Sequence, residues 1–496
     1  MNTKLLVNGE LRETGEKQEV IDPSCGEVIT EVCVASSKEI ELALQSARDG
    51  FDKGAWPGLS LKERKEFILK ISQGILDNAQ ELASLETLNT GKPIKESTFM
   101  DIPSAAKTFE HFANNLEKYL EQENIAISAA TGDSESRLSR QPQGVVVLIV
   151  PWNYPLLIAS WKMAQALAAG NTVILKPSSL TPLTALKLAE IIQGAGLPDG
   201  SVNILNGPGQ DLGEALCSDK RVDMVSFTGS NEVGKEIINY SSRNVKKLIM
   251  ELGGKSAGII FKDADLESAV NGSLCSVFLN QGQMCTAMSR IFVEDGIYDR
   301  FIENFVAKAR RIKLGRGEDF ETQMGPLISE YQRGKVLEYV EKAKKEGAKL
   351  LCGGRIPVSE KLKNGFFLEP AVFSGVNPGM KIFREEVFGP VSCVSRFSGA
   401  EEAVSLANNT DFALASAVWT RDLKKANELA LRLNAGCVWI NTYGMFYNEA
   451  PYGGFKQSGF GKELGKEGFL EYTFLKNIIT DKALDSKPLV NYWYGF

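Results

Sequence analysis

Two kinds of hydrophobic pattern follow one another along the chain, and they predict different structures. Within residues 36–126, apolar side chains recur every three or four positions, which is the spacing of amphipathic helices. A helix start is predicted at Ser37, a serine cap followed by early acidic residues. A longer helical run is predicted over residues 61–88, and Gly91-Lys92-Pro93 ends it.

From Gly144 onward, continuous runs of apolar, largely β-branched residues replace the helical spacing. Such a run predicts a strand that is buried on both faces, as in a parallel sheet. Strands are predicted at residues 145–150, 172–175, 201–205 and 222–227, with helices at 159–169 and 183–194. Further strands are predicted at 246–250 and 256–261, and the alternation continues to residue 440, for example in a helix at 331–346 followed by a strand at 349–351. Strand and helix alternate twice over, which predicts an α/β protein with two open α/β domains.

Three segments stand outside this alternation. The first nine residues predict a short strand and a turn, without the basic and apolar regions of a signal peptide. Residues 127–141 are polar and predict an exposed arm, and residues 472–496 predict a strand-like piece with an aromatic end.

Composition then narrows the possible functions. A chain of 496 residues is too long for one hydrophobic core, so two or three domains are expected. A net charge of -6 argues against nucleic acid as a partner, and no segment has the apolar length of a membrane span. Eight scattered cysteines without a CxxC pair predict a reducing, cytoplasmic compartment and no zinc site. His111 is the single histidine, so a base must be a carboxylate or a lysine, and no metal site is expected.

Cys285 is the candidate nucleophile. It follows Asn280-Gln281-Gly282-Gln283-Met284 in a region that is otherwise rich in small and apolar residues. A thiolate adds readily to a carbonyl carbon if its pKa is lowered and the resulting oxyanion is stabilised. The same residues taken alone also fit a buried, inert cysteine.

Glu251 is the candidate general base. It lies between apolar residues and precedes Gly253-Gly254, which predicts poor solvation and a raised pKa. The alternative is a structural glutamate held in a salt bridge.

The ends of three predicted strands carry candidate binding groups. Residues 222–227 run into Thr228-Gly229-Ser230, where glycine and a helix N-terminus suit a phosphate, or alternatively a tightly packed corner. Lys176 ends another strand at the sheet edge where α/β folds bind ligands, although a solvated lysine is the alternative. Asn153 follows a third strand and offers an amide donor to an oxyanion.

Taken in order, these segments resemble the aldehyde dehydrogenase family over nearly the whole chain. The motifs that carry the resemblance are Pro151-Trp152-Asn153, Lys176-Pro177-Ser178, Phe227-Thr228-Gly229-Ser230, Glu251-Leu252-Gly253-Gly254-Lys255, Gly282-Gln283-Met284-Cys285 and Glu385-Glu386-Val387-Phe388-Gly389-Pro390. The resemblance continues through Pro451-Tyr452-Gly453-Gly454 and Gly461-Lys462-Glu463-Leu464-Gly465.

This resemblance implies a role for each matching residue. Cys285 is the nucleophile that forms a thiohemiacetal and then a thioester, and Asn153 with the Cys285 N–H forms the oxyanion hole. Glu251 activates the hydrolytic water, and Lys162 with Glu463 relays protons away from it. Residues implied in binding NAD or NADP are Trp152, Lys176, Ser178, Ser179, Gly209, Gly229, Ser230, Val233, Leu252, Glu386 and Phe388.

One departure from the family pattern concerns the cofactor. NAD-preferring relatives usually carry a glutamate, which grips the ribose hydroxyls, where this chain has Ser179. A carboxylate there would repel the extra phosphate of NADP, and serine removes that repulsion. The sequence therefore predicts that NADP is accepted beside NAD.

The substrate prediction is narrower. Within the family, the chain is most similar to the betaine aldehyde and aminoaldehyde dehydrogenases. Tyr154, Trp161 and Tyr452 are predicted to line a cage that attracts a quaternary ammonium group. The alternative is an ordinary hydrophobic tunnel for general aliphatic aldehydes or semialdehydes. Leu279, where some relatives have an aromatic residue, and Tyr452, where tryptophan is frequent, weaken the cage, and Glu449 and Glu471 lie near this region of the sequence.

Other classes of function fit less well. A non-catalytic binding protein of this fold would lose Cys285 or Glu251, and a CoA-acylating relative usually lacks the glutamate base. The resemblance further implies a Rossmann-like dinucleotide-binding domain formed by residues 1–122 and 143–253, and a catalytic domain over residues 254–453. Residues 123–142 and 468–496 are expected to form a β arm and tail that build a homo-oligomer, either a dimer or a tetramer.

Overall fold

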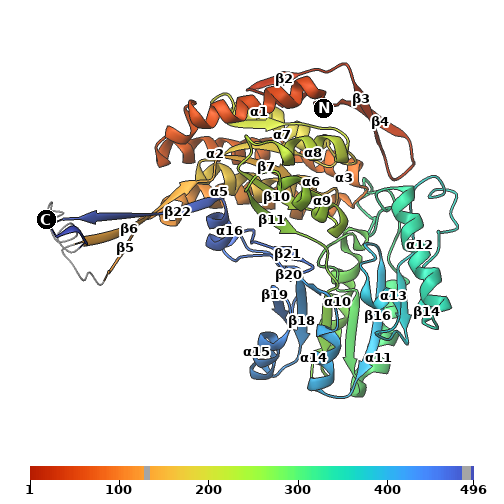
Figure 1. The fold of residues 1–496 in the computed structure, drawn as a ribbon. Helices are drawn as coiled ribbons and strands as arrows, with labels where there is room; N and C mark the ends of the chain where they lie inside the picture. The colour runs from red at the N-terminus through yellow and green to blue at the C-terminus, as the bar shows by residue number, and fades with distance from the viewer. Residues whose placement is uncertain (128–133, 483–492, 496) are drawn as a thin grey trace.

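A computed structural model describes residues 1–127, 134–482 and 493–495. It is an α/β protein built around two mainly parallel sheets, with a small antiparallel sheet that projects from the body (Figure 1). Apart from β21, an edge strand contributed by the C-terminal part of the chain, the two large sheets are formed by successive parts of the chain, as the alternating pattern predicts. The domain boundary at residues 253–254 stays a prediction.

The first sheet has the strand order β2-β1-β9-β8-β7-β10-β11-β21. Its central strands β9, β8, β7, β10 and β11 are parallel, and β1, β2 and β21 are antiparallel at the edges. The strands are β1 (Leu5–Val7), β2 (Glu10–Arg12), β7 (Val145–Ile149), β8 (Thr172–Lys176), β9 (Val202–Ile204), β10 (Met224–Thr228), β11 (Lys247–Glu251) and β21 (Gly459–Phe460).

Helices cover both faces of this sheet, which explains the uninterrupted apolar runs. On β7, Val146 and Leu148 pack into one core while Val145 and Val147 pack into another, and all four are fully buried. The first core includes residues of α2 (Leu61–Asp77), α5 (Ile102–Tyr119) and α6 (Pro155–Ala169). The second includes residues of α1 (Ser37–Asp52), α8 (Gly209–Ser218) and α9 (Asn231–Ser241). The remaining helices of this half are α3 (Ala79–Thr90), α4 (Ile94–Glu96), α7 (Leu183–Ala195) and α16 (Gly465–Glu471).

The second sheet has the order β14-β15-β16-β13-β12-β18-β19, and only the β14–β15 pair is antiparallel among its described strands. The strands are β12 (Ala257–Ile260), β13 (Arg290–Glu294), β14 (Lys349–Cys352), β15 (Ala371–Ser374), β16 (Val391–Phe397), β18 (Ala415–Trp419) and β19 (Cys437–Ile440). The helices are α10 (Leu266–Phe278), α11 (Tyr298–Ala309), α12 (Glu330–Lys345), α13 (Lys381–Arg384), α14 (Ala400–Asn408) and α15 (Leu423–Arg432).

The small sheet joins distant parts of the chain. Strand β6 (Ser134–Pro142) pairs antiparallel with β22 (Thr473–Asp481) on one side and with β5 (Glu123–Ile125) on the other, and it extends away from the body (Figure 1). The predicted arm and tail therefore form one element, although residues 128–133, 483–492 and 496 lie outside the described residues. Two further pairs are β3 (Lys17–Ile21) with β4 (Val28–Cys33), and β17 (Phe412–Ala413) with β20 (Phe455–Lys456).

Three details of the predicted helices are corrected. Helix α1 begins at Ser37 as predicted, but its cap is Ser36, in a capping box with Glu39. The helical run at residues 61–88 is two helices, which meet at Asn78, the C-cap of α2. Helix α6 begins at Pro155 because proline at the first position needs no hydrogen-bond acceptor for its nitrogen. Among the described residues, no helix combines the length and apolar character needed to cross a membrane.

Candidate active site

Cys285 follows a tight turn that is held in an unusual backbone conformation. After α10 the chain passes through Leu279–Gly282, where Asn280 has φ 47° and Gln281 has φ 58°. Residues other than glycine rarely adopt this left-handed region, which costs about 1–2 kcal/mol per residue. Such strain persists only where surrounding contacts enforce it, and it gathers at functional sites. Gly282 is required for space, because a Cβ there would lie 2.3 Å from the Gly389 carbonyl oxygen.

Asn153 lies against the same turn. Its side-chain Nδ2 donates to the Gln283 backbone carbonyl at 2.8 Å. The backbone carbonyl of Asn153 accepts from Asn280 Nδ2 at 3.1 Å. An amide nitrogen carries two hydrogens, so one remains for a substrate oxygen. The structure therefore brings the predicted oxyanion donor and the predicted nucleophile together.

The Cys285 thiol lies beside Tyr452 and is neutral at rest. Its Sγ is 3.4 Å from the Tyr452 hydroxyl. Burial raises the pKa of Cys285 to about 12, and the Tyr452 hydroxyl and the Thr286 N–H lower it only in part. The lowered pKa that a ready nucleophile needs is therefore absent, and a base must take the thiol proton.

Glu251 ends β11 and is 3% exposed. Neither of its carboxylate oxygens has a hydrogen-bond partner or an ion pair among the described residues. Burial, followed by the charge of Glu463, raises the pKa of Glu251 well above its usual value. The alternative of a structural glutamate in a salt bridge does not describe this environment.

Lys162 and Glu463 form a buried ion pair of 2.6 Å, as the resemblance implies. Sequence reasoning missed three polar partners that complete the network. Ser226 Oγ accepts from Lys162 Nζ at 2.8 Å, Gln165 Nε2 donates to Glu463 at 2.9 Å, and the Tyr472 hydroxyl lies 3.1 Å from Ser226. Because Glu463 and Glu251 line one cavity, this network reaches from that cavity into the protein.

Cys285 lines a cavity of about 550 Å³. Its lining includes predicted cofactor residues, namely Trp152, Gly229, Ser230, Leu252, Glu386 and Phe388. Ser230 caps α9 by accepting the Val233 N–H at 3.3 Å. The carboxylate of Glu386 accepts the Gly254 N–H at 3.0 Å, and burial raises its pKa to about 7.

Other predicted cofactor residues lie apart from that lining, at the carboxyl end of β8 and at the N-termini of two helices. Lys176 is 4% exposed, and burial lowers its pKa to about 8. Among the described residues, its ammonium group makes one hydrogen bond, to the Pro177 carbonyl at 3.4 Å. Ser178 and Ser179 follow it in the chain, Gly209 begins α8, and Val233 lies in the first turn of α9.

Cys285 also lines a second, smaller cavity of about 170 Å³. The predicted substrate residues Tyr154, Trp161 and Tyr452 all line it. The Trp161 ring lies 5.6 Å from both Tyr452 and Phe446, and Phe446 lies 5.2 Å from Tyr452. Phe446 and Tyr443 were missed, although the aromatic segment Tyr443-Gly444-Met445-Phe446 just before the Pro451 motif could have indicated them.

Two findings bear on the charge of this cavity. Glu449 lies 3.7 Å from His111, whose pKa is lowered by burial, and Glu471 forms an ion pair with Lys247; neither glutamate lines the cavity. The ring of Tyr154 is already faced by Lys92, whose Nζ is 4.1 Å from the ring centroid.

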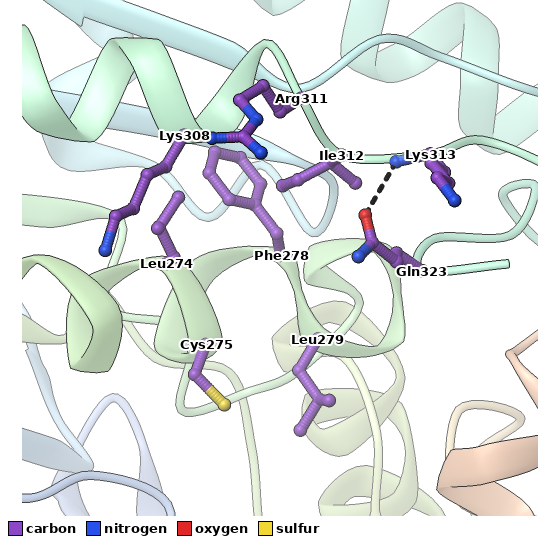
Figure 2. A pocket seen from close by; sticks show the side chains of 9 residues that line it. All are labelled: Leu274, Cys275, Phe278, Leu279, Lys308, Arg311, Ile312, Lys313 and Gln323. Carbon is purple, nitrogen blue, oxygen red and sulfur yellow. Dashed lines mark hydrogen bonds between the residues drawn. The ribbon is translucent and has the colours of Figure 1, made fainter. Parts of the chain in front are cut away.

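Beside this cavity lies an outer groove of about 670 Å³. It shares Cys275 and Leu279 with the substrate cavity. Figure 2 shows Lys308, Arg311 and Lys313 around its apolar side chains. The groove next to the substrate cavity is therefore basic.

Comparison with known proteins agrees with this geometry. The model of the "Aldehyde dehydrogenase family" matches residues 11–478. The chain is 46% identical to betaine aldehyde dehydrogenase of Bacillus subtilis over the full length of both, and 42% identical to human retinal dehydrogenase 2 over 96% of this chain and 91% of that protein. The crystal structure of Staphylococcus aureus betaine aldehyde dehydrogenase in complex with NAD+ is 40% identical, covers 97% of this chain and 95% of that one, and superposes with a TM-score of 0.94. The chain therefore belongs to the aldehyde dehydrogenase family.

Proposed function

We propose that this enzyme oxidises an aldehyde to a carboxylic acid through a covalent intermediate on Cys285, with NAD or NADP as the hydride acceptor. The observation that carries this proposal is that Cys285 lines two cavities, and that Glu251, which is buried and without a hydrogen-bond or ion-pair partner among the described residues, lines the smaller one. One cavity suits an aldehyde and the other a dinucleotide. The further proposal is that the aldehyde is betaine aldehyde or a related aminoaldehyde.

The residues around the larger cavity fit a nicotinamide dinucleotide. Glu386 offers a buried carboxyl group to ribose hydroxyls, and the N-terminus of α9 offers N–H groups to a pyrophosphate. Phe388 and Trp152 place two rings 5.1 Å apart in its wall. Lys176, Ser178, Ser179 and Gly209 would hold the adenosine half, and Leu252, Gly229 and Val233 would complete the contacts. When bound, the dinucleotide accepts a hydride.

The chain's own residues carry out the remaining steps. Cys285 loses its proton to a base and adds to the aldehyde carbon, and the Asn153 amide with the Cys285 N–H holds the oxyanion. After hydride loss the product is a thioester on Sγ. Glu251 then removes a proton from water as the water attacks the thioester carbonyl; the C–S bond breaks, Cys285 leaves as a thiolate and the carboxylic acid is released. Lys162 and Glu463 would pass the proton into the protein interior.

The size and walls of the smaller cavity support a compact substrate. About 170 Å³ is below the range of roughly 300–1,000 Å³ that is usual for larger ligands. The Trp161, Phe446 and Tyr452 rings would face a trimethylammonium group with their electron-rich faces. The Bacillus and Staphylococcus relatives are both named betaine aldehyde dehydrogenase, which supports betaine aldehyde as the substrate.

Replacing Trp161 with leucine tests the cage. We expect the ratio of kcat/KM for betaine aldehyde to that for 3,3-dimethylbutanal, an uncharged analogue of the same shape, to fall about 2- to 30-fold, because one cation–π contact contributes roughly 0.5–2 kcal/mol. Steady-state rates with both aldehydes on both proteins measure this ratio. A general packing defect would lower kcat/KM for both aldehydes, so it cancels in this ratio.

The second candidate is a general aliphatic or semialdehyde dehydrogenase without cation preference. Lys92 against Tyr154 and the basic groove beside the cavity favour it. An unchanged ratio in the Trp161→Leu protein, with equal use of both aldehydes by the native enzyme, would establish this second function.

Replacing Ser179 with glutamate tests the cofactor proposal. We expect the NADP-to-NAD ratio of kcat/KM to fall at least tenfold, equivalent to about 1.4 kcal/mol. The physical reason is repulsion between the new carboxylate and the 2′-phosphate of NADP. Ser179→Gln is the control because it has the same size without the charge, and it should shift the ratio much less. Equal shifts in the two variants would contradict the electrostatic explanation.

The projecting sheet supports the proposal of a homo-oligomer. Ile125, Phe474, Leu475 and Ile479 on β5 and β22 are exposed apolar residues. A second copy of the chain would cover such side chains. A dimer and a tetramer both remain compatible with this surface.

A further inference from the structure

Glu96 is a buried carboxyl group that contacts the turn preceding Cys285. It ends α4 and is 8% exposed. Its two carboxylate oxygens lie 3.0 and 3.3 Å from the backbone nitrogen of Asn280, which donates to them. This N–H is the only hydrogen-bond partner of the Glu96 side chain among the described residues, and no ion pair within 4.0 Å competes for it there.

Asn280 connects this contact to the oxyanion site. Asn280 is the first residue of this turn held at positive φ, and its side-chain nitrogen donates to the backbone carbonyls of Asn153 and Gln283 at 3.1 and 3.3 Å. The Asn153 amide in turn donates to the same Gln283 carbonyl at 2.8 Å. A displacement of Asn280 would therefore move both the Asn153 main chain and the acceptor that orients its side chain.

Other charged groups lie near Glu96, but they do not touch the turn. Lys92 and Asp101 form a fully buried ion pair of 2.6 Å, and Glu86 accepts a hydrogen bond from Thr184 at 2.8 Å. Burial raises the pKa of Glu96 to about 8, with Lys92 lowering and Asp101 raising it. Near neutral pH the neutral carboxylic acid is therefore substantially populated. The length of the side chain, which brings an oxygen to the Asn280 N–H, therefore matters more for this hydrogen bond than the charge of the carboxyl group.

We infer that Glu96 is a positioning residue for the oxidation: its carboxyl group holds the Asn280 N–H, and through this turn it fixes the Asn153 amide beside Cys285. The contact explains how a strained turn keeps one conformation in the absence of substrate. The inference goes beyond the proposed function because it applies to any aldehyde that reacts at Cys285.

Two substitutions of Glu96 separate the effect of its side-chain length from the effect of its charge. Glu96→Asp keeps the carboxylate but withdraws it by one bond length, about 1.5 Å, while Glu96→Gln keeps the reach and an acceptor oxygen but removes the charge. We expect Glu96→Asp to lower kcat about tenfold with KM changed less than threefold, and Glu96→Gln to stay within threefold of the native kcat. Assays with betaine aldehyde and, separately, propanal keep this test valid whichever substrate proposal holds.

The same pair of substitutions at Glu86 is the matched control, because that residue is also buried and lies near the same ion pair without a hydrogen bond to the turn. Both Glu86 variants should keep kcat within threefold. In an Asn153→Ala background, Glu96→Asp should cause no further loss. The inference is overturned if the glutamine variant loses as much as the aspartate variant, if neither loses activity, or if the loss persists without the Asn153 amide. Unfolding midpoints within a few degrees exclude a general folding defect.

Discussion

Replacing Cys285 with serine is expected to lower kcat on the order of 10⁴-fold or more, while the protein keeps its fold and its cofactor affinity. A serine hydroxyl occupies nearly the same space but is a much poorer nucleophile than a thiolate. Burial already raises the pKa of the native thiol to about 12, and the same burial would make a hydroxyl harder still to ionise. Reduced-cofactor absorbance at 340 nm and a cofactor titration by protein fluorescence measure the two properties.

Cys437→Ser is the matched control for that substitution. Cys437 begins β19, is partly buried and does not line either cavity. The Cys437→Ser variant should keep kcat within threefold of the native value. Retention of more than about a hundredth of the native rate in Cys285→Ser would mean that hydride transfer does not require a covalent intermediate on this residue.

The main architecture could be predicted because burial on both faces leaves a clear signal in the sequence. In β7, side chains that alternate between two cores must all be apolar, so the run at residues 145–150 stands out. Pro155 shows where this reasoning fails. Proline is compatible with a rigid loop and with the first turn of a helix, and only the packing of α6 selects the second.

The candidate site could be predicted where function resides in short motifs, and it could not where function depends on tertiary contacts. Glu251, Cys285 and Glu463 lie in motifs that can be matched directly. Phe446 enters the aromatic wall only because the fold brings its loop against Trp161 of α6. Glu96 lies 184 residues from Asn280 in sequence, and nothing in its local pattern indicates that contact.

The raised pKa of Cys285 poses a chemical question that the sequence could not raise. A neutral thiol needs a base before it can attack the aldehyde carbon. Water likewise needs a base before it can hydrolyse the thioester. Glu251 lines the same cavity as Cys285, and its own pKa is raised, so it could serve either step. The two roles predict different kinetics once that carboxyl group is removed.

Replacing Glu251 with glutamine is expected to lower steady-state kcat about 10²- to 10⁴-fold, with an initial burst of about one reduced cofactor per active site. The burst follows because the thioester still forms but its hydrolysis has lost the base. Rapid-mixing absorbance measures the burst, and intact mass spectrometry should detect the acyl group on the protein. The double variant Glu251→Gln with Cys285→Ser is the control and should show neither.

The pH dependence of the native enzyme provides an independent test of the same role. A base must be ionised, and a carboxyl group with a raised pKa becomes ionised only when the pH exceeds that raised value. The native kcat should therefore rise with pH through an apparent pKa well above that of an ordinary glutamate, and this rise should be absent in Glu251→Gln. A slow variant without a burst would instead assign Glu251 to the Cys285 proton, because the step that forms the thioester would then be the one that fails.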